Sequence, residues 1–386
     1  EIALPPSTNY QDIEIKNIIP TPLNVRIDKD GNWLAQYLLS SSQKINVVVE
    51  GKAKVFLTPK KEPESQEKLK KYLKEQPYWE ASNVDIKKMA KTLKTPNNIY
   101  EYLVKNLTYD FSRVTEQKDR LGGAQVLKNP KSAVCLEFTD LFIALARAAG
   151  IPAREVDGFA YTEDDDERPL SLVKDVLHAW PEYYDYERQT WVMIDPTWGN
   201  TTRGLDYFHT LDFDHFAFVI KGESSEYPVA AGGYKLEGDV FEKDVIVGFS
   251  DSFGDVIPKL VITEEFSDSN FSGIPIKGKI TVRNVGQYVS EYQNATVSAK
   301  FLNPGHQEIS IEKIPPFGYS TVDVSFDKTP ILTNTNDTIT ITLNGESVSR
   351  NLRVVPIFLH ELSLLTGGVL LAITTIIISI IAIKTR

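Results

Sequence analysis

Residues 135–154 read CLEFTDLFIALARAAGIPAR and carry the chain's one cysteine at their first position. The stretch is strongly apolar, which predicts a buried and rigid helix from about Cys135 to Ala149, ended by Gly150-Ile151-Pro152. A thiol in the first turn of a helix lies at the positive end of the helix dipole, which lowers its pKa and favours the thiolate. We therefore predict that Cys135 is a nucleophile rather than a small buried side chain.

A cysteine nucleophile needs a partner that handles protons, usually a histidine oriented by a carboxylate or an amide. His178 begins a strand-like run, and Asp195 ends the next one. If the turn at 186–189 has an even number of residues, Asp195 is a diagonal neighbour of His178 on the same face of the hairpin. An odd turn without a bulge would place them on opposite faces. Cysteine, histidine and aspartate in this order predict a triad.

Three segments of the chain resemble motifs of the transglutaminase-like superfamily, in the right order. They are residues 135–154, His178-Ala179-Trp180 and Asp195-Pro196-Thr197. The resemblance covers roughly residues 85–220 and implies a papain-like α+β fold. It also implies that Cys135 is the nucleophile, that His178 is the general base and acid, and that Asp195 orients the histidine. Many members have glycine two residues before the cysteine, where this chain has Ala133, which is still small.

Three further residues are candidates for the substrate cleft: Trp180, Trp198 and Gln125. Members of the superfamily stabilise the oxyanion with the cysteine N–H and a nearby side chain, and Gln125 is a weak candidate for that side chain. The two tryptophans flank the triad. We interpret them as residues of the core or of the cleft wall, in preference to specific contacts to an acyl donor. The other histidines are interpreted as structural or exposed, with no zinc site: His209, His215, His306 and His360.

The rest of the chain divides into segments of different character. Residues 1–60 are strand-like runs split by turn residues and predict an N-terminal β region. Residues 61–228 place helices before antiparallel strands, which predicts an α+β transglutaminase-like catalytic domain. Residues 245–356 are short alternating strands at turn spacing and predict an Ig-like β-sandwich, interpreted as a stalk or adhesion module.

Residues 362–383 contain no charged side chain and predict one C-terminal transmembrane helix. At about 1.5 Å per residue this helix would be roughly 33 Å long, and a hydrocarbon core is about 30 Å thick. Because Lys384 and Arg386 follow it, we expect a single-pass type I protein of the cell membrane, with residues 1–360 outside and the C-terminus cytoplasmic. A first residue other than methionine, Glu1, fits a chain whose signal peptide has been removed, although trimming would look the same.

Sequons of the form Asn-x-Ser/Thr agree weakly with an exported glycoprotein. The glycosylation candidates are Asn106, Asn200, Asn270, Asn294 and Asn336.

The charge balance bears on partners. The chain has 42 basic and 52 acidic residues, so nothing neutralises a phosphate backbone, and nucleic-acid binding is not expected. The acidic run Glu163–Glu167 is interpreted as a solvated loop, because consecutive acids lack the spacing of a calcium loop. Calcium at Asp164, Asp165 and Asp166 is the weaker alternative, and no other cofactor is expected.

The leading hypothesis is a membrane-anchored cysteine acyl-transfer enzyme that acts outside the cell on amide bonds of a protein or peptide substrate. Resolution of the thioester by water would make it a protease or amidase, and resolution by a lysine amine would make it a crosslinking transglutaminase. Hydrolysis is favoured. The alternative is a non-catalytic scaffold of the cell envelope, or an accessory subunit of a membrane complex whose small residues in 362–383 allow close helix packing.

Overall fold

The computed structural model describes residues 1–116, 119–164, 166–170, 177–210, 212–233, 244–357 and 368–378. It divides the chain into two units, residues 1–257 and residues 258–386. The first unit carries all of the candidate catalytic residues, and each unit is described separately below.

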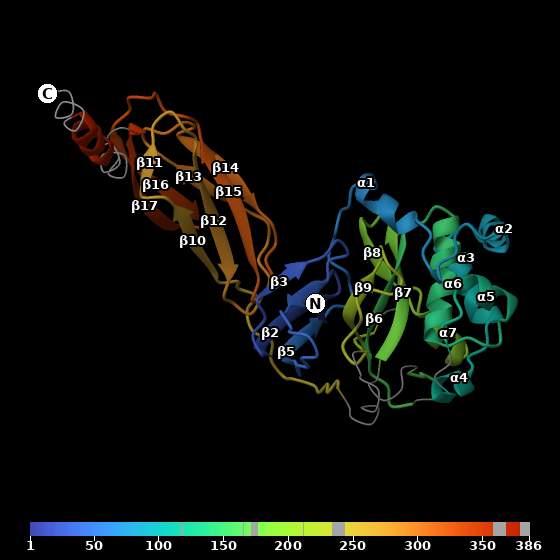
Figure 1. Ribbon diagram of the computed structural model, residues 1–386. Helices are drawn as coiled ribbons and strands as arrows, with labels where there is room; N and C mark the ends of the chain where they lie inside the picture. The colour runs from blue at the N-terminus through green and yellow to red at the C-terminus, as the bar shows by residue number, and fades with distance from the viewer. Residues whose placement is uncertain are drawn as a thin grey trace. The chain divides into compact units, whose positions relative to one another are not determined.

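A four-stranded antiparallel sheet with the strand order β8-β7-β6-β9 forms the centre of the first unit (Figure 1). Its strands are β6 (Ala153–Ala160), β7 (Leu177–Asp185), β8 (Thr190–Met193) and β9 (His215–Lys221). The long helix α6 (Cys135–Ala148) packs against β6 and β7. Sheet and helix therefore share one core, in which Phe138, Leu141 and Phe142 have no exposed surface.

Local chemistry explains where α6 begins and ends. The helix starts at Cys135, as predicted, because the Glu137 carboxylate reaches back and accepts the N–H of Val134 at 3.1 Å. It ends before Gly150, whose φ of +83° only glycine adopts without strain. Cys135 thus occupies the first turn, where the backbone N–H groups lack partners within the helix.

Shorter helices surround α6. They are α1 (Gln66–Leu69), the 3₁₀ helix η1 (Lys70–Leu73), α2 (Val84–Leu93), α3 (Pro96–Asn106), α4 (Phe111–Glu116), α5 (Gly123–Lys128) and α7 (Pro196–Thr201). Asn83 caps α2 and Thr95 caps α3, each through a side-chain oxygen that accepts first-turn N–H groups. Helices α2, α3 and α5 contact α6 directly, which completes the helical layer.

The N-terminal strands lie on the other side of the sheet from the helices (Figure 1). They are β1 (Ile2–Leu4), β2 (Gln11–Ile19), β3 (Asn24–Ile27), β4 (Trp33–Gln36) and β5 (Val48–Val55), in the sheets β1-β4-β3 and β2-β5. Their side chains pair with the open edge of β9: the Gln11 amide exchanges two hydrogen bonds with Ala217, and the Asn32 amide does so with Ile220. This pairing satisfies backbone groups that an edge strand would leave open.

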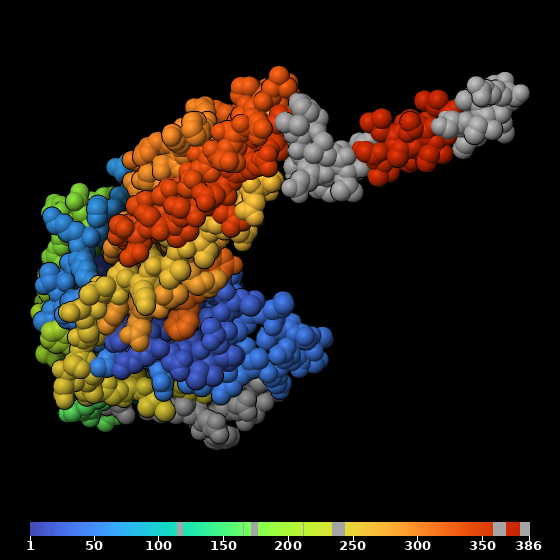
Figure 2. Space-filling model, turned by 90° about the vertical axis from the view of Figure 1, so that its left-hand side faces the viewer, coloured from blue at the N-terminus to red at the C-terminus, as the bar shows by residue number. Residues whose placement is uncertain are grey.

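The second unit is a β-sandwich of two sheets, β10-β12-β15 and β11-β17-β16-β13-β14, seen as the yellow-to-orange body in Figure 2. Its strands are β10 (Leu260–Phe266), β11 (Ser269–Phe271), β12 (Ile276–Asn284), β13 (Gln293–Ser298), β14 (His306–Ile311), β15 (Tyr319–Phe326), β16 (Thr335–Leu343) and β17 (Glu346–Val355). Alternate residues face inward, as in β16, where Ile339, Ile341 and Leu343 are buried.

The predicted transmembrane helix at 362–383 is wrong. Across the residues that the structure describes, no helix combines the length and the apolar character needed to cross a membrane. Within the predicted span only residues 368–378 are described, and they are helical. Residues 362–367, residues 379–383 and the flanking Lys384 and Arg386 lie outside the described residues.

The predicted localisation in the cell membrane is corrected with it. That prediction, with an outer side and a cytoplasmic side, depended on a spanning helix at 362–383, and among the described residues no helix can cross a membrane. The prediction used apolar composition alone, whereas crossing a membrane also requires a helix of sufficient length.

Candidate active site

His178 and Asp195 meet at the β7–β8 hairpin. The turn at 186–189 has four residues, and the strands pair Asp185 with Thr190 and Glu182 with Met193. The strand pairs end at Met193, before α7 begins at Pro196, and the same count of residues places Asp195 on the side of the hairpin that carries His178. Nε2 of His178 lies 2.9 Å from Oδ2 of Asp195, and both side chains are buried.

Asp195 is held by backbone as well as by histidine. It is the N-cap of α7, and its Oδ1 accepts the N–H groups of Thr197 at 2.9 Å and Trp198 at 3.1 Å. Burial by itself would raise the pKa of Asp195, but hydrogen bonds and charge interactions with His178 and His215 outweigh burial and hold the pKa well below its usual range. Asp195 is therefore an ionised, fixed carboxylate.

The proton arrangement of His178 follows from that carboxylate. An ionised carboxylate only accepts hydrogen bonds, so Nε2 of His178 carries hydrogen. In the neutral ring Nδ1 is then the basic atom. Nδ1 is buried, and among the described residues it has no hydrogen-bond partner. A proton can therefore be exchanged at Nδ1.

Cys135 lies at the start of the helix that packs on the strand carrying His178. The cysteine is fully buried in the first turn of α6, and α6 contacts β7 along the sheet. The positive end of the helix dipole at this position favours a thiolate. Cys135, His178 and Asp195 thus come from α6, β7 and the β8–α7 junction.

The three predicted cleft residues differ in burial and in their contact with His178. Trp198 is fully buried and stacks on His178, with ring centroids 5.2 Å apart and an interplanar angle of 19°. Trp180 is also buried, and its ring centroid lies 6.0 Å from that of His178. Gln125, in contrast, is exposed on α5. The two tryptophans therefore form aromatic walls of the His178 site, and the exposed Gln125 is a poor choice for an oxyanion donor.

Sequence reasoning missed His215, which was interpreted as structural or exposed. It is buried at the start of β9, with Nε2 at 3.3 Å from Oδ2 of Asp195 and Nδ1 at 2.8 Å from Oδ1 of Asp212. Burial alone would lower the pKa of His215, but the carboxylates of Asp212 and Asp195 outweigh burial and raise the pKa to about 10. In the sequence, His215 follows Asp212 by three residues and Asp214 by one, at the start of an apolar strand, but this pattern does not reveal the contact with Asp195.

Tyr109 was also missed. Its strand-like contact with Ala133 holds it beside the segment that leads into Cys135. The hydroxyl is buried without a hydrogen-bond partner among the described residues, and burial, followed by the nearby Cys135, Glu137 and Asp195, raises the pKa of Tyr109. A buried donor without an acceptor next to a nucleophile is a better oxyanion candidate than Gln125.

One group of ligand-type side chains has the spacing for a metal ion. Ligand atoms of His178, Asp195 and His215 all lie within 4.8 Å of one another. Both ring nitrogens of His215 face carboxylate oxygens, however, and the raised pKa keeps that ring protonated near neutral pH. A protonated imidazole cannot ligate a metal, so this cluster fits proton chemistry better.

The acidic loop and the sequons were the other predicted sites. Oδ1 of Asp164 accepts the N–H groups of Asp166 and Glu167, each at 3.1 Å, in an exposed turn, and Asp165 lies outside the described residues. The sequon amide of Asn200 donates to Val104 O and Leu107 O, and a glycan there would replace one of its two hydrogens and so remove at least one of these bonds. Of the other sequons, Asn106, Asn294 and Asn336 are exposed and Asn270 is half-buried.

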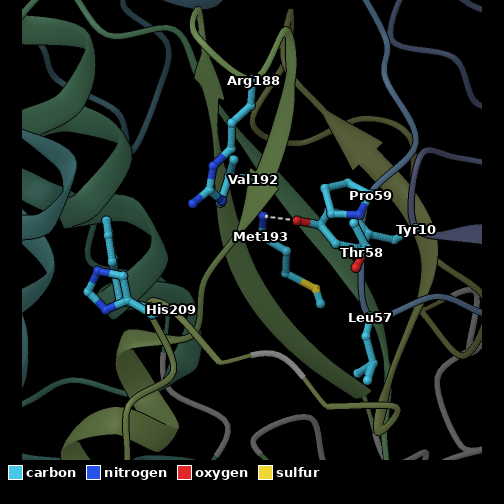
Figure 3. A pocket seen from close by; sticks show the side chains of 9 residues that line it. Tyr10, Leu57, Thr58, Pro59, Arg188, Val192, Met193 and His209 are labelled. Atoms are coloured by element: carbon cyan, nitrogen blue, oxygen red, sulfur yellow. Dashed lines mark hydrogen bonds between the residues drawn. The ribbon is translucent and has the colours of Figure 1, made fainter.

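A pocket of about 180 Å³ lies beside β8 (Figure 3). Tyr10 closes one side of it, and the Tyr10 hydroxyl accepts the N–H of Met193 at 3.1 Å. The rest of its lining is Leu57, Thr58, Pro59, Arg188, Val192, Phe208 and His209. Neither Cys135 nor His178 contributes to the lining, so this pocket is separate from the candidate active site.

Comparison with known proteins gives three similarities. The uncharacterized protein YebA of Bacillus subtilis (strain 168) is 34% identical over 110 residues, which are 27% of this chain and 15% of that protein. The crystal structure of a putative cysteine protease from Cytophaga hutchinsonii is 15% identical, with a TM-score of 0.37, over 59% of this chain and 82% of that chain. Red sea bream transglutaminase is 14% identical, with a TM-score of 0.23, over 67% of this chain and 53% of that chain.

The family assignment comes from residues 81–196, which match the model of the transglutaminase-like superfamily. This match includes Cys135, His178 and Asp195. The predicted resemblance is thereby confirmed, over a slightly different range from the one expected. Members of the superfamily typically carry out cysteine-based acyl transfer, and transglutaminase-like enzymes act on protein substrates. The similarity to a transglutaminase-like core is thus limited to residues 81–196 of the 386-residue chain.

Proposed function

We propose that this protein is a cysteine acyl-transfer enzyme, in which Cys135 is the nucleophile, His178 the general base and acid, and Asp195 the residue that orients the histidine. One observation carries the proposal: the buried contact of 2.9 Å between His178 and the ionised Asp195, which leaves Nδ1 of His178 without a partner among the described residues. The strand with this base packs against the helix that begins at Cys135.

The chemistry follows from these positions. Nδ1 of His178 takes the proton of the Cys135 thiol, and the thiolate attacks an amide carbonyl carbon of a protein or peptide. As the C–N bond breaks, His178 returns the proton to the leaving amine, and a thioester remains on Cys135. Nδ1 then takes a proton from water or from a second amine, which attacks the thioester and releases the thiol. Asp195 stabilises the imidazolium that forms in each half of the cycle.

Hydrolysis is the favoured outcome. Cys135 and His178 both have no exposed surface, so the thioester forms in a closed site. The acyl substrate must already open this site to reach Cys135; once the thioester has formed, water needs little additional room, whereas crosslinking requires the lysine side chain of a second protein to enter as well. The product is then a free carboxylic acid, and the enzyme is a protease or an amidase rather than a crosslinking transglutaminase.

The proposal is tested by the rate at which iodoacetamide alkylates Cys135 in the full chain, measured against pH. A free thiol titrates near pH ~8.5, whereas a thiolate paired with imidazolium stays reactive well below neutrality. We expect alkylation of the native chain at pH 6 to exceed that of His178→Ala by at least tenfold. His209→Ala is the matched control. His209, like His178, pairs with an aspartate, but it is exposed, and its partner is Asp206.

Equal profiles in the native chain and His178→Ala would contradict the proposal. The chain would then act as a non-catalytic scaffold, in which a transglutaminase-like core presents a surface and Cys135 is an inert core residue. Denaturation with urea before labelling provides the reference rate of an unstructured thiol for both variants.

A further inference from the structure

His215 touches the carboxylate that orients the candidate base, yet the triad chemistry above does not use it. Its Nε2 lies 3.3 Å from the Asp195 oxygen that also contacts His178. Its Nδ1 lies 2.8 Å from Asp212. Because both acceptors are carboxylates, both ring nitrogens carry hydrogen, and the ring holds one positive charge between two negative charges.

The surroundings keep this charge in place. His215 is 5% exposed, and its ring lies against those of Trp198 and Trp180, with centroid distances of 4.6 and 5.0 Å. These contacts fix the ring plane, so the imidazolium cannot turn away from Asp195 without disturbing the aromatic walls of the site.

Other titratable groups face the same cluster from the elements packed around it. Asp214 comes from the turn before β9, Arg168 from the loop after β6, His178 from β7 and Tyr207 from the segment after α7. The charges of Asp214 and Arg168 are of opposite sign, and both groups are less buried than His215. The main balance is therefore between His215 and the two aspartates, Asp195 and Asp212.

We infer that His215 is a positioning residue: its imidazolium holds the Asp195 carboxylate toward His178 and balances the negative charge of Asp212. The inference rests on the proposed function of the Cys135–His178–Asp195 triad. With His215 charged, the triad operates beside one net negative charge; without it, two close carboxylates face the triad. An additional buried negative charge disfavours the Cys135 thiolate, so His215 sets the pH range in which the nucleophile is ionised.

The test compares pH profiles of iodoacetamide alkylation for the native chain, His178→Ala, His215→Gln and the double variant His215→Gln/Asp212→Asn. Glutamine retains a hydrogen-bond donor but carries no charge. We expect His215→Gln to lower the alkylation rate at pH 6 about tenfold and to move the midpoint up by on the order of one pH unit. The double variant removes one positive and one negative charge, so its midpoint should return to within about 0.3 unit of the native value.

A purely structural role for His215 predicts another pattern. Loss of packing would lower the stability of both His215 variants. The pH midpoint of Cys135 alkylation, measured on the molecules that remain folded, would then be unchanged. The matched control is His209→Gln/Asp206→Asn, which makes the same change in an exposed aspartate–histidine pair separated by three residues. It should leave the profile at the native midpoint.

The outcomes separate the two proposals. A native chain that labels like His178→Ala contradicts the proposed function itself. A native chain with a His178-dependent profile, together with an unshifted midpoint in His215→Gln, contradicts the role of His215 alone. If His215→Gln does not fold, the double variant decides: restored charge balance with a native midpoint supports the inference, and a shifted midpoint in the folded double variant overturns it.

Discussion

The two units of this chain bury different kinds of polar group. In the first unit, Glu155 is fully buried between Arg120 and Lys221, and His215 lies between two aspartates. In the sandwich, among its described residues, Asp337 is the one buried charged side chain, and it accepts the backbone N–H groups of Lys300, Phe301 and Leu302. Buried charge in the first unit pairs with other charge, whereas in the sandwich it closes a turn.

This difference shows where chemistry can be located. Burial of an ion pair costs desolvation free energy, and loss of one partner leaves an unpaired buried charge. Such pairs also shift pKa values and hold charged groups in fixed positions. An apolar core with backbone-capping polar groups offers stability without such shifts. The first unit therefore contains charged groups with shifted pKa values in fixed positions, whereas the described part of the sandwich has a mainly apolar core. The predictions below compare the buried charged groups of the first unit with the apolar core of the sandwich.

The largest effect is expected for Glu155→Gln in the first unit. The change keeps the shape but removes the charge that holds Arg120 and the Lys221 ammonium, which lies 3.0 Å away. Breaking a buried charge network in this way costs about 3–5 kcal/mol, measured as the free energy of unfolding in urea. Glu291→Gln is the matched control, because Glu291 pairs with Lys313 at the surface of the sandwich and should cause no measurable loss. A Glu155 variant as stable as the native chain would show that the network contributes nothing.

The next effect is a pH dependence from His215. Its folded-state pKa is raised to about 10 from an ordinary value near ~6.5, so its charge stabilises the folded state fully below about pH 6.5. This contribution, on the order of a few kcal/mol, is lost as pH rises through 10. We expect the stability difference between the native chain and His215→Gln to shrink steadily from pH 6.5 to pH 10. A difference that stays constant over this range would show that His215 is not charged.

A smaller effect is expected in the sandwich for Ile341→Val. Ile341 is fully buried in β16, and loss of one methylene group there costs about 1 kcal/mol. Because no charge is involved, the cost should be the same at pH 6.5 and pH 10, in contrast to the cost of His215→Gln. A pH-dependent cost would mean that the stabilities of the two units are coupled through titrating groups.

The smallest stability effect is expected for Tyr109→Phe. The lost hydroxyl is buried without a partner among the described residues, so its removal should leave the free energy of unfolding unchanged or raise it by up to about 1 kcal/mol. If this hydroxyl stabilises the oxyanion, formation of an acyl-enzyme should slow by about 10²-fold in the same variant. A clear loss of stability would indicate that the hydroxyl has an acceptor in the folded chain.

Local patterns were sufficient to predict part of the site. The start of α6 at Cys135 depends on its own first turn, and the His178–Asp195 contact depends on an even turn of four residues between adjacent strands. His215 could not be found in this way. It reaches Asp195 only because β9 lies beside β6, and strand order in a sheet is a long-range property. The prediction of a membrane span at 362–383 relied on composition, which reports the hydropathy of a segment and not the extent of a helix.

The most direct test of the central claim is to look for an acyl group on Cys135. The full chain is incubated with p-nitrophenyl acetate, a small activated acyl donor suited to a closed site, and then analysed by mass spectrometry. We predict one acetyl group per native chain, located at Cys135, with release of one equivalent of p-nitrophenolate before turnover. His178→Ala should acetylate at least tenfold more slowly, and Cys135→Ala should carry no acetyl group at this position. A folded native chain that leaves Cys135 unmodified, or that acetylates it as fast without His178, would contradict the account.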